Sequence, residues 1–355
     1  MKKSQEFELR KRCGDPNALC GVKEYVFSDG PARGVRAFDL KNGRGLELTV
    51  ATDRGLDIPY CSFKGVNAGL LNKVGLRSPW LYQEDAARGF LRQFYGGLLT
   101  TGGLSYAGAA CEEEGRVLGL HGNFDNTPAD SVRAWRDVEG DDVVLRVAGE
   151  IRESEVFGPH LLVKRTLTLE TEANRLRIHD EVENQGFLTS ALMLVYHINF
   201  GYPLLDDGAR IYTNASQVSP RNEFAREGMD DYDRMEAPEV GREEQCYFHT
   251  GQPGAEAFAM LHNERLGMAA VVRYDAAQLP QLCEWKCMRA GEYAIGLEPT
   301  TSGVLSRADA RRDGVLGQIE PGEIRTYDVT IEFTDDSSAI DALKARARRP
   351  QGGLS

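Results

Sequence analysis

Apolar and polar residues alternate with a period of two over much of this 355-residue chain, and this alternation restricts the possible folds most strongly. Near the C-terminus, Val329, Ile331 and Phe333 alternate with polar neighbours. Such a pattern is typical of an antiparallel strand with one buried face. The same pattern occurs in residues 161–170 and 175–183, and the turn signal between them predicts a hairpin.

Further strand patterns are spread along the whole chain, whereas helical patterns are scarce. The clearest predicted helix covers residues 338–349, and a short tail is expected after residue 350. Residues 223–244 are acidic and have no regular pattern, so we expect them to form a long loop on the surface, which we call the acidic excursion. No repeat or linker divides the sequence, so we predict one domain over residues 1–355, an all-β fold built as a large antiparallel sandwich. The remaining predicted strands are residues 46–51, 143–151, 189–198, 268–274 and 293–298.

The composition is ordinary for a soluble globular protein, and the net charge argues against nucleic acid as a partner. Hydrophobic residues make up 41% and charged residues 27% of the chain, and the formal net charge of -12 opposes nucleic-acid binding. Residues 1–12 lack the apolar core of a signal peptide, and no apolar run approaches the roughly 18 residues of a membrane span. We therefore expect a cytoplasmic protein without a membrane partner. Its seven scattered cysteines are then expected to be reduced thiols.

Two strands carry polar residues where apolar ones are expected. Glu298 ends a strand face whose other members are Ala294 and Gly296, which would leave open space beside the carboxylate. His197 and Asn199 share one face of an apolar strand, and burying both without a partner is unfavourable. The alternatives are an ordinary glutamate at the strand end, since Pro299 should end that strand, and a hydrogen-bonded core histidine.

Other motifs give weaker or negative evidence. His121 lies in a Leu-His-Gly loop segment, which means little by itself. The glycine-rich residues 96–104 lack a phosphate-binding signature, and Cys283 and Cys287 have no second pair to complete a zinc site. There is also no nucleophile elbow of a serine hydrolase. We therefore predict neither a metal nor a cofactor.

Three segments carry a resemblance to a known family: Leu-His-Gly at residues 120–122, His-Ile-Asn-Phe at 197–200, and a late strand ending at Glu298. Their order resembles the aldose 1-epimerase (galactose mutarotase-like) superfamily. Short motifs such as Asp-Arg-Gly-Leu-Asp at residues 53–57 and Phe-Tyr-Gly-Gly-Leu at 94–98 resemble motifs of a poorly characterised branch of this superfamily, which is a domain of unknown function. The resemblance covers nearly the whole chain and implies a β-supersandwich.

This resemblance also implies roles for the candidate residues. Glu298 would be the general base, His197 the general acid, and His121 would assist at the ring oxygen of a sugar. Opening the ring and closing it again would interconvert anomers, which requires one proton to be removed and one to be donated. Ring opening would start with Glu298 ionised and His197 protonated, states that their mutual attraction favours and burial opposes.

The candidates for binding sugar hydroxyls are Arg54, Asp57, Arg92, Asn199 and Lys286. The alternative is a structural role: an ion pair between Arg54 and Asp57, or a solvated strand position for Lys286. Trp285 or Tyr202 would stack on a sugar or belong to the core.

Several questions remain open at the level of the sequence. Asn123 stands where the resemblance leads us to expect an arginine, so the charge of the preferred sugar is undecided. An acidic sugar would need a basic cluster, which Arg88 and Arg92 would supply. A sugar isomerase or lyase on the same scaffold, and a non-catalytic sugar-binding or sensing protein, are the alternative functions. The oligomeric state is open, a homodimer being one possibility.

Overall fold

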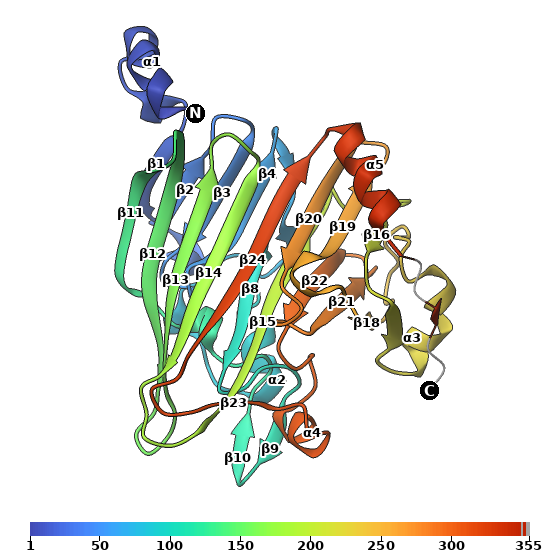
Figure 1. Cartoon of the computed structure of the whole chain (residues 1–355). Coiled ribbons are helices and arrows are strands. Elements are labelled where there is room, and N and C mark those ends of the chain that lie inside the picture. Colours follow the sequence, from blue (N-terminus) through green and yellow to red (C-terminus); the bar gives the residue numbers. More distant parts are fainter. Residues whose placement is uncertain (349–350, 353–355) are drawn as a thin grey trace.

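The computed structural model describes residues 1–348 and 351–352, and two large antiparallel sheets dominate it (Figure 1). Within the described residues one sheet has thirteen strands and the other eight. The larger sheet runs in the order β1 (Gly21–Val26), β2 (Arg36–Lys41), β3 (Leu46–Ala51), β4 (Asp57–Phe63), β8 (Leu99–Leu104), β15 (Ser190–Phe200), β22 (Ala294–Thr300), β21 (Gln281–Cys287), β18 (Gln245–Thr250), β17 (Gln217–Pro220) and β25 (Gln351–Gly352). In addition, β5 (Val66–Asn67) pairs with β4, and β23 (Gly317–Ile319) pairs with β15.

The smaller sheet faces the larger one and consists mostly of long strands. Its order is β11 (Asp130–Glu139), β12 (Asp142–Ser154), β13 (His160–Glu170), β14 (Arg175–Asn184), β24 (Ile324–Thr334), β20 (Met268–Tyr274), β19 (Ala257–Asn263) and β16 (Arg210–Thr213). Two short pairs stand apart, β6 (Leu70–Leu71) with β7 (Gly96–Gly97) and β9 (Cys111–Glu113) with β10 (Arg116–Leu118). This is the large antiparallel sandwich that the alternation predicts.

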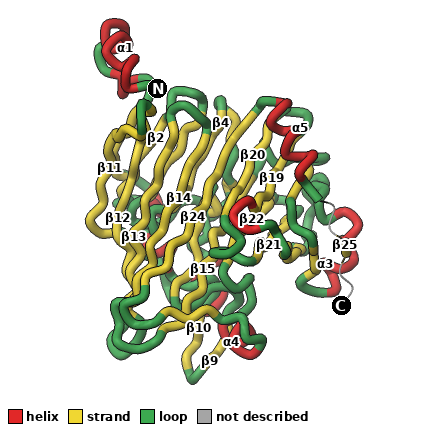
Figure 2. The backbone as a smooth tube through the Cα atoms, in the orientation of Figure 1, coloured by secondary structure: helices red, strands yellow, loops and turns green. Residues whose placement is uncertain are grey.

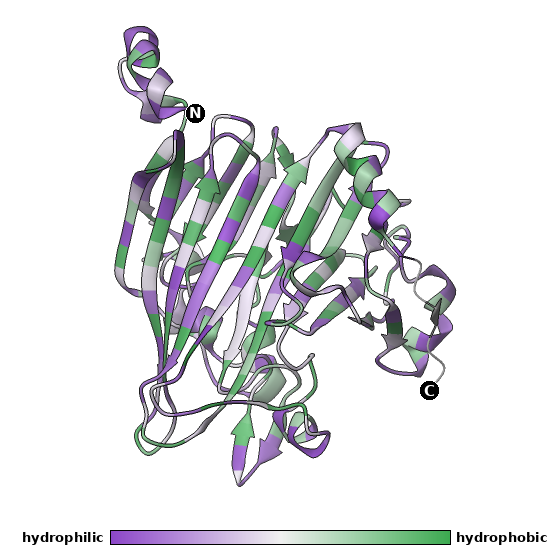
Figure 3. Cartoon of the chain, in the orientation of Figure 1, coloured by the Kyte–Doolittle hydropathy of each residue, from purple (hydrophilic) through white to green (hydrophobic). Residues whose placement is uncertain are grey.

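The period-two pattern corresponds to the observed strands, and Figure 3 shows it as alternating hydrophobic and hydrophilic bands. The predicted hairpin exists, since β13 pairs with β14 from Leu161 opposite Asn184 to Leu169 opposite Leu176. The inward-facing residues of β13, β14 and β24 are buried against those of β8, β15 and β22. The predicted strand at residues 293–298 is too short, because β22 continues through Pro299 to Thr300.

Helices are few and short (Figure 2), and the sequence predicts only one of them. That helix, α5 (Ser337–Arg346), begins where the Asp336 side chain accepts a hydrogen bond from the Ser338 backbone N–H. It ends at Arg346, so the predicted end at residue 349 is too late, since Ala347 already has an extended backbone; the tail, apart from β25, lies outside the described residues. The acidic excursion contains α3 (Glu223–Glu227), and the other helices are α1 (Glu6–Cys13), α2 (Ala86–Leu91) and α4 (Arg307–Arg312). No helix of the described chain is long and apolar enough to cross a membrane.

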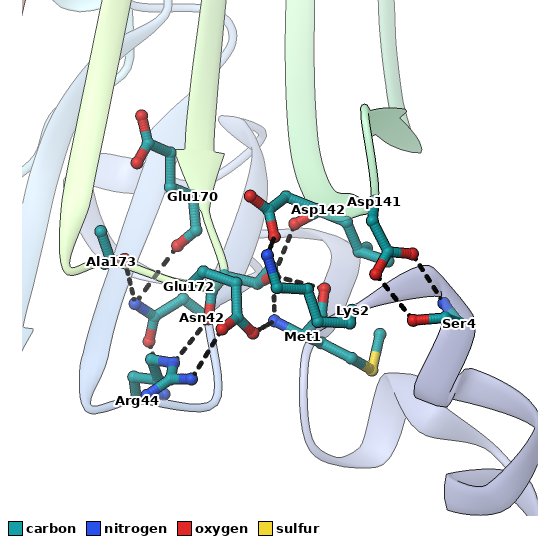
Figure 4. Close-up of polar contacts among 12 residues, drawn as sticks. Met1, Lys2, Ser4, Asn42, Arg44, Asp141, Asp142, Glu170, Glu172 and Ala173 are labelled. Carbon is teal, nitrogen blue, oxygen red and sulfur yellow. Dashed lines mark hydrogen bonds and ion pairs between the residues drawn. The ribbon is translucent and has the colours of Figure 1, made fainter.

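The N-terminus is fastened to the smaller sheet, while α1 extends away from the two sheets (Figure 1). The Met1 ammonium contacts Glu172 and donates a hydrogen bond to Thr171. Lys2 forms an ion pair with Asp142, and the Ser4 backbone N–H donates to Asp141 at 2.9 Å (Figure 4). These contacts fix the first four residues, so α1 starts from an anchored point.

A buried ionic network joins the two sheets. Arg165 on β13 donates to Asp180 on β14 at 2.7 and 2.9 Å and to Asp57 on β4 at 2.9 Å. The hydroxyl of Tyr196 on β15 also donates to Asp180, at 2.7 Å, and Thr101 on β8 donates to Asp57. The side chains of Arg165, Asp57 and Asp180 are at most 1% exposed. Since Tyr196 and Thr101 flank the strand positions of the candidate site, this network also fixes the backbone of that site.

Candidate active site

Strand pairing places His197 directly opposite Glu298. The register of β15 with β22 pairs Val195 with Thr300 and Ile198 with Leu297, so His197 and Glu298 face each other on the same side of the larger sheet. The His197 Nε2 atom lies 3.2 Å from Glu298 Oε1. The ladder is interrupted here, because Pro299 has no N–H to donate. This side is the outer face of the larger sheet, opposite to the one that packs on the smaller sheet.

Small residues form the floor around this pair, as the sequence indicates, but the space above Gly296 is not empty. A Cβ atom on Gly296 would be too close to Glu298 Oε1, and it would lie 3.2 Å from the Trp285 Cβ atom. The Glu298 carboxylate therefore lies back over Gly296 and fills the space that we expected a ligand to occupy. Next to it on the floor are Cys283 and Cys246, both at most 2% exposed.

Aromatic rings surround the pair and bring His121 to it. The His197 ring lies 5.6 Å from that of His121, 5.1 Å from that of Phe94 and 5.3 Å from that of Trp285, measured between centroids. The Phe90 ring lies 5.0 Å from that of His121. The three residues predicted as catalytic therefore lie together, although they come from distant parts of the sequence.

Polar atoms without hydrogen-bond partners converge at this place. Among the described residues, Glu298 Oε1, His197 Nδ1 and Asn199 Oδ1 are buried and unpartnered. The contact between His197 and Glu298 is thus short in distance but does not have hydrogen-bond geometry. Buried polar atoms are nearly always satisfied in folded proteins, so a cluster of unsatisfied ones marks a place where a ligand or water binds.

Burial determines the protonation of the site. It lowers the pKa of His197 to about 3, with a further contribution from the nearby His121. It raises the pKa of Glu298 well above the usual range, with Cys246 and Glu244 adding to this shift and Arg221 opposing it. A protonated Glu298 beside a neutral His197 is therefore the favoured state of the empty site. Burial thus acts against the ion pair expected at the start of ring opening, and the mutual attraction of the two groups acts for it.

His121 is held by its backbone in an unusual conformation. Its φ of 56° lies in the left-handed region, and its N–H donates to the Gly108 carbonyl at 2.8 Å. The Gly108 N–H in turn donates to His121 Nδ1 at 3.3 Å, which leaves the ring proton on Nε2. Burial lowers the pKa of His121 to about 4, in agreement with this neutral form.

Two predicted sugar-binding residues are buried inside the protein, and these predictions are wrong. Arg54 is completely buried; it donates to Asp125 at 2.7 Å and to backbone carbonyls, including that of Gln93. Asp57 is equally buried and belongs to the network with Arg165. The alternative of an ion pair between Arg54 and Asp57 is also wrong, because each has a different partner.

The other three predicted binding residues have different positions. The prediction that Lys286 contacts a sugar is wrong, because its side chain faces the inner side of the sheet. There it lies 2.9 Å from Glu236 and donates hydrogen bonds to two backbone carbonyls. Arg92 lies 3.1 Å from Asp85, to which Arg88 also turns, so the expected basic cluster is compensated by a carboxylate. Asn199 alone lies beside the pair, on the same face as His197 and opposite Gly296.

Sequence reasoning missed Glu244 and Arg221, which lie on the same face of the sheet. The Trp285 indole N–H donates to Glu244 at 2.7 Å, and Arg221 donates to the other carboxylate oxygen at 2.9 Å. Both residues come from the acidic excursion or its borders, where no pattern predicted structure. The only available signal was the spacing of Glu244, which lies two residues before Cys246 and four before Phe248 and so shares their face at the start of β18.

A cavity of about 500 Å³ lies elsewhere, on the outer side of β1–β4, and none of the candidate catalytic residues lines it. His197 is 7% and Glu298 2% exposed, so the side chains above them shield both residues from solvent. Among the described residues, no group of three His, Cys, Asp or Glu side chains is arranged to hold a metal ion. The chemistry available at this face is proton transfer between a carboxyl group and imidazoles.

The fold places this protein among the galactose mutarotase-like β-supersandwiches. A protein from Klebsiella pneumoniae, provisionally assigned as an aldose 1-epimerase, is 24% identical with a TM-score of 0.85, over 92% of this chain and 86% of that one. A galactose mutarotase-like protein from Clostridium acetobutylicum is 13% identical with a TM-score of 0.60, over 90% and 99% of the two chains. Galactose 1-epimerase from Lactobacillus acidophilus is 15% identical with a TM-score of 0.57, over 89% and 99%.

The chain belongs to the family described as Domain of unknown function (DUF4432), whose sequence profile matches residues 32–333. No curated protein matches the sequence. The identities to the solved structures are low, so these similarities establish the fold and leave the activity to be argued from the site.

Replacing His121 by asparagine should make unfolding less dependent on pH. In the folded protein the pKa of His121 is lowered to about 4, so below its unfolded pKa of about 6.5 only the unfolded chain takes up a proton. Wild type should therefore lose about 2 kcal/mol more than His121→Asn between about pH 7 and about pH 5, measured by urea unfolding. Asparagine tolerates the left-handed backbone conformation.

His179→Asn is the control for this experiment. His179 is exposed, and although partial burial lowers its pKa, the hydrogen bond to Asp328 raises the pKa overall. Its removal should change the pH dependence in the opposite direction. Equal slopes for wild type and His121→Asn would show that His121 is not neutral in the folded state.

Gly296→Ala should displace the carboxylate of Glu298 without changing the strand. Position 296 lies in regular β22 conformation and accepts alanine, but the added methyl group would occupy the place of Glu298 Oε1. We expect an unchanged unfolding midpoint and a loss of about tenfold or more in proton-transfer activity at the pair, measured as anomer exchange. Circular dichroism and NMR exchange measurements on the same preparation distinguish the two effects, and unchanged exchange would contradict this placement of Glu298.

Proposed function

We propose that this protein is a mutarotase that interconverts the anomers of a monosaccharide by general acid–base catalysis. The observation that carries the proposal is the contact between Glu298 and His197, 3.2 Å apart and with unsatisfied atoms on the outer face of the sheet. The galactose mutarotase-like fold and the family membership support it. Glu298, His197 and His121 are the catalytic residues of this proposal, and Asn199 contacts the substrate.

The protonation of the pair fits both halves of the reaction. In ring opening, ionised Glu298 removes the proton of the anomeric hydroxyl, and protonated His197 gives its proton to the ring oxygen. The C–O bond breaks, and the open-chain carbonyl form is left beside a protonated Glu298 and a neutral His197. After rotation about the bond next to the carbonyl, the reverse transfers close the ring to the other anomer.

The state left after ring opening is the one that burial favours in the empty site. It holds the same single proton as the ion pair, and moving this proton from Glu298 to His197 interconverts the two states. The anomeric hydroxyl of a bound sugar donates to an ionised carboxylate, and the ring oxygen accepts from a protonated imidazole. Binding of the closed sugar therefore stabilises the ion pair, whereas the open form is complementary to the neutral pair.

The test is saturation-transfer NMR with a panel of aldoses, ketoses and acidic sugars. Accelerated exchange between anomers of at least one sugar is the expected result. Formation of a new compound would instead indicate an isomerase or lyase on the same scaffold. Binding without any exchange would indicate a sugar sensor, and either outcome would overturn the mutarotase assignment.

A further inference from the structure

An ion pair lies above the floor of the candidate site, and we call Arg221 and Glu244 the rim pair. Their side chains are 34% and 46% exposed, and one guanidinium nitrogen lies 2.9 Å from a carboxylate oxygen. The second carboxylate oxygen of Glu244 accepts the Trp285 indole N–H at 2.7 Å, and the Trp285 ring lies 5.3 Å from that of His197. A continuous chain of contacts thus leads from the catalytic pair to the rim pair.

The register of the strands shows that the rim pair faces the catalytic residues. The Arg221 backbone N–H donates to the Cys246 carbonyl at 3.0 Å, Cys246 is opposite Trp285, and Trp285 is opposite Gly296. Opposite residues in an antiparallel sheet share a face, so Arg221 lies on the face of Glu298. The strands that carry Arg221 and Glu298 are separated by three strand spacings, about 14 Å, and Trp285 on a strand between them contacts both Glu244 and His197.

The charges of the rim pair also act on two residues of the site. Glu244 raises the pKa of Glu298 on the sheet and of His121 in the loop, and Arg221 lowers the pKa of both. The rim pair is therefore close enough to influence both the sheet residue and the loop residue of the site electrostatically. The floor below them consists of Cys246 and Cys283, which are at most 2% exposed.

The rim pair offers both kinds of hydrogen-bonding group that neighbouring sugar hydroxyls require. The carboxylate accepts from a hydroxyl, and the guanidinium, with five N–H donors, donates to the oxygen of the next one. An anionic substituent of a sugar is not attracted to the rim pair. The charge of Arg221 is already compensated by Glu244, and Glu244 repels a second negative charge. Burial favours the neutral forms of Glu298 and of both imidazoles, and in the ion pair of ring opening the charges of Glu298 and His197 cancel, so the catalytic groups provide no net charge to attract it.

We propose that the rim pair is the specificity determinant of this site, which selects an uncharged monosaccharide and excludes sugars with a carboxylate or phosphate group through Glu244. This inference rests on the proposed function, and it names the substrate class. Binding of the sugar replaces the contact between Trp285 and Glu244, and this opens the way to His197 and Glu298.

The experiment compares Glu244→Gln with wild type on galactose, glucose, galacturonate and glucose 6-phosphate. Anomer exchange is measured by NMR, and binding is measured by calorimetry with the same four compounds. Wild type should prefer the neutral sugars. Glu244→Gln leaves Arg221 uncompensated, so the ratio of acidic to neutral sugar turnover, or of affinity, should rise by about tenfold or more.

Two further variants complete the design. Arg221→Gln leaves Glu244 uncompensated and should lower the same ratio below that of wild type. Glu223→Gln is the matched control, because Glu223 forms an exposed ion pair with Arg226, 3.2 Å apart, a few residues from Arg221. It should leave the ratio unchanged.

The outcomes distinguish this inference from the proposed function. Exchange of sugars with a wild-type preference for acidic ones, or with a ratio unaffected by Glu244→Gln, would overturn the role of the rim pair and leave the mutarotase intact. Absence of exchange with all sugars would overturn the mutarotase, while the affinity ratio would still decide the role of the rim pair. If none of the four compounds binds or is turned over, both proposals are wrong.

Discussion

Glu298→Gln should reduce anomer exchange by about 10²–10⁴-fold, the usual contribution of a positioned acid–base group. Glutamine has nearly the same shape and still fits above Gly296, but its amide cannot exchange a proton with His197 or with a sugar. Burial raises the pKa of this carboxyl group and thereby favours its neutral form, so a neutral amide should change the unfolding midpoint little. NMR exchange and thermal unfolding measure the two effects separately.

The chain contains a closely matched control for this substitution. Glu284 is also a completely buried glutamate paired with a histidine, since its carboxylate lies 2.8 Å from His249 Nε2. It lies on β21 next to β22, but it faces the inner side of the sheet. Glu284→Gln should therefore leave the exchange rate per folded molecule unchanged. If both substitutions reduce this rate equally, the loss comes from a disturbed sheet, and Glu298 is not the proton-transfer group.

The strands and their faces could be predicted because period-two alternation is a local property. It gives the face of Glu298 relative to Leu297 and the face of His197 relative to Ile198, and both are observed. That the two side chains meet depends on the register between strands about one hundred residues apart. No local pattern specifies this register. The sequence therefore indicated the contact between His197 and Glu298 only through its resemblance to a family.

The inner polar residues show why other predictions were wrong. Glu284 and Lys286 alternate with Cys283 and Trp285, a pattern that normally indicates an exposed polar face. In the structure, Lys286 donates to the carbonyls of Asp231 and Arg234 in the acidic excursion, which covers this face. The acidic excursion, which has no periodic pattern, therefore buries the polar face of β21 that the alternation indicates as exposed. Alternation shows that a strand has two faces, but it does not show what will cover each of them.

Short helices escaped prediction for a related reason. The helix α2 has only six residues, and although Asp85 precedes it, the Asp85 side chain makes no capping hydrogen bond, so its start signal is weak. Its Phe90 is nevertheless part of the aromatic surroundings of His121, with ring centroids 5.0 Å apart. Tertiary packing stabilises such short helices, and isolated helices of this length are not stable. The residues that shape the candidate site were therefore the least predictable part of it.

Arg165→Met should destabilise the protein by about 3–5 kcal/mol, the usual effect of removing one partner from a buried ion pair. Two carboxylates depend on Arg165, Asp180 on the same sheet and Asp57 on the opposite one. Methionine fills most of the volume, but it leaves both carboxyl groups without a cation in the interior. The free energy of unfolding in urea, compared with wild type at neutral pH, measures the loss.

Asp57→Asn in the Arg165→Met background shows whether the loss comes from uncompensated charge. Burial already raises the pKa of Asp57 to about 7, so an amide at this position replaces a group that protonates easily, and it should recover part of the lost stability. Arg152→Met on the neighbouring strand β12 is the control, because Arg152 is 40% exposed in its pair with Glu150 and should change stability by less than about 1 kcal/mol. A similarly small effect of Arg165→Met would show that hydrophobic packing alone joins the two sheets, and that the network with Tyr196 does not position the strand that carries His197.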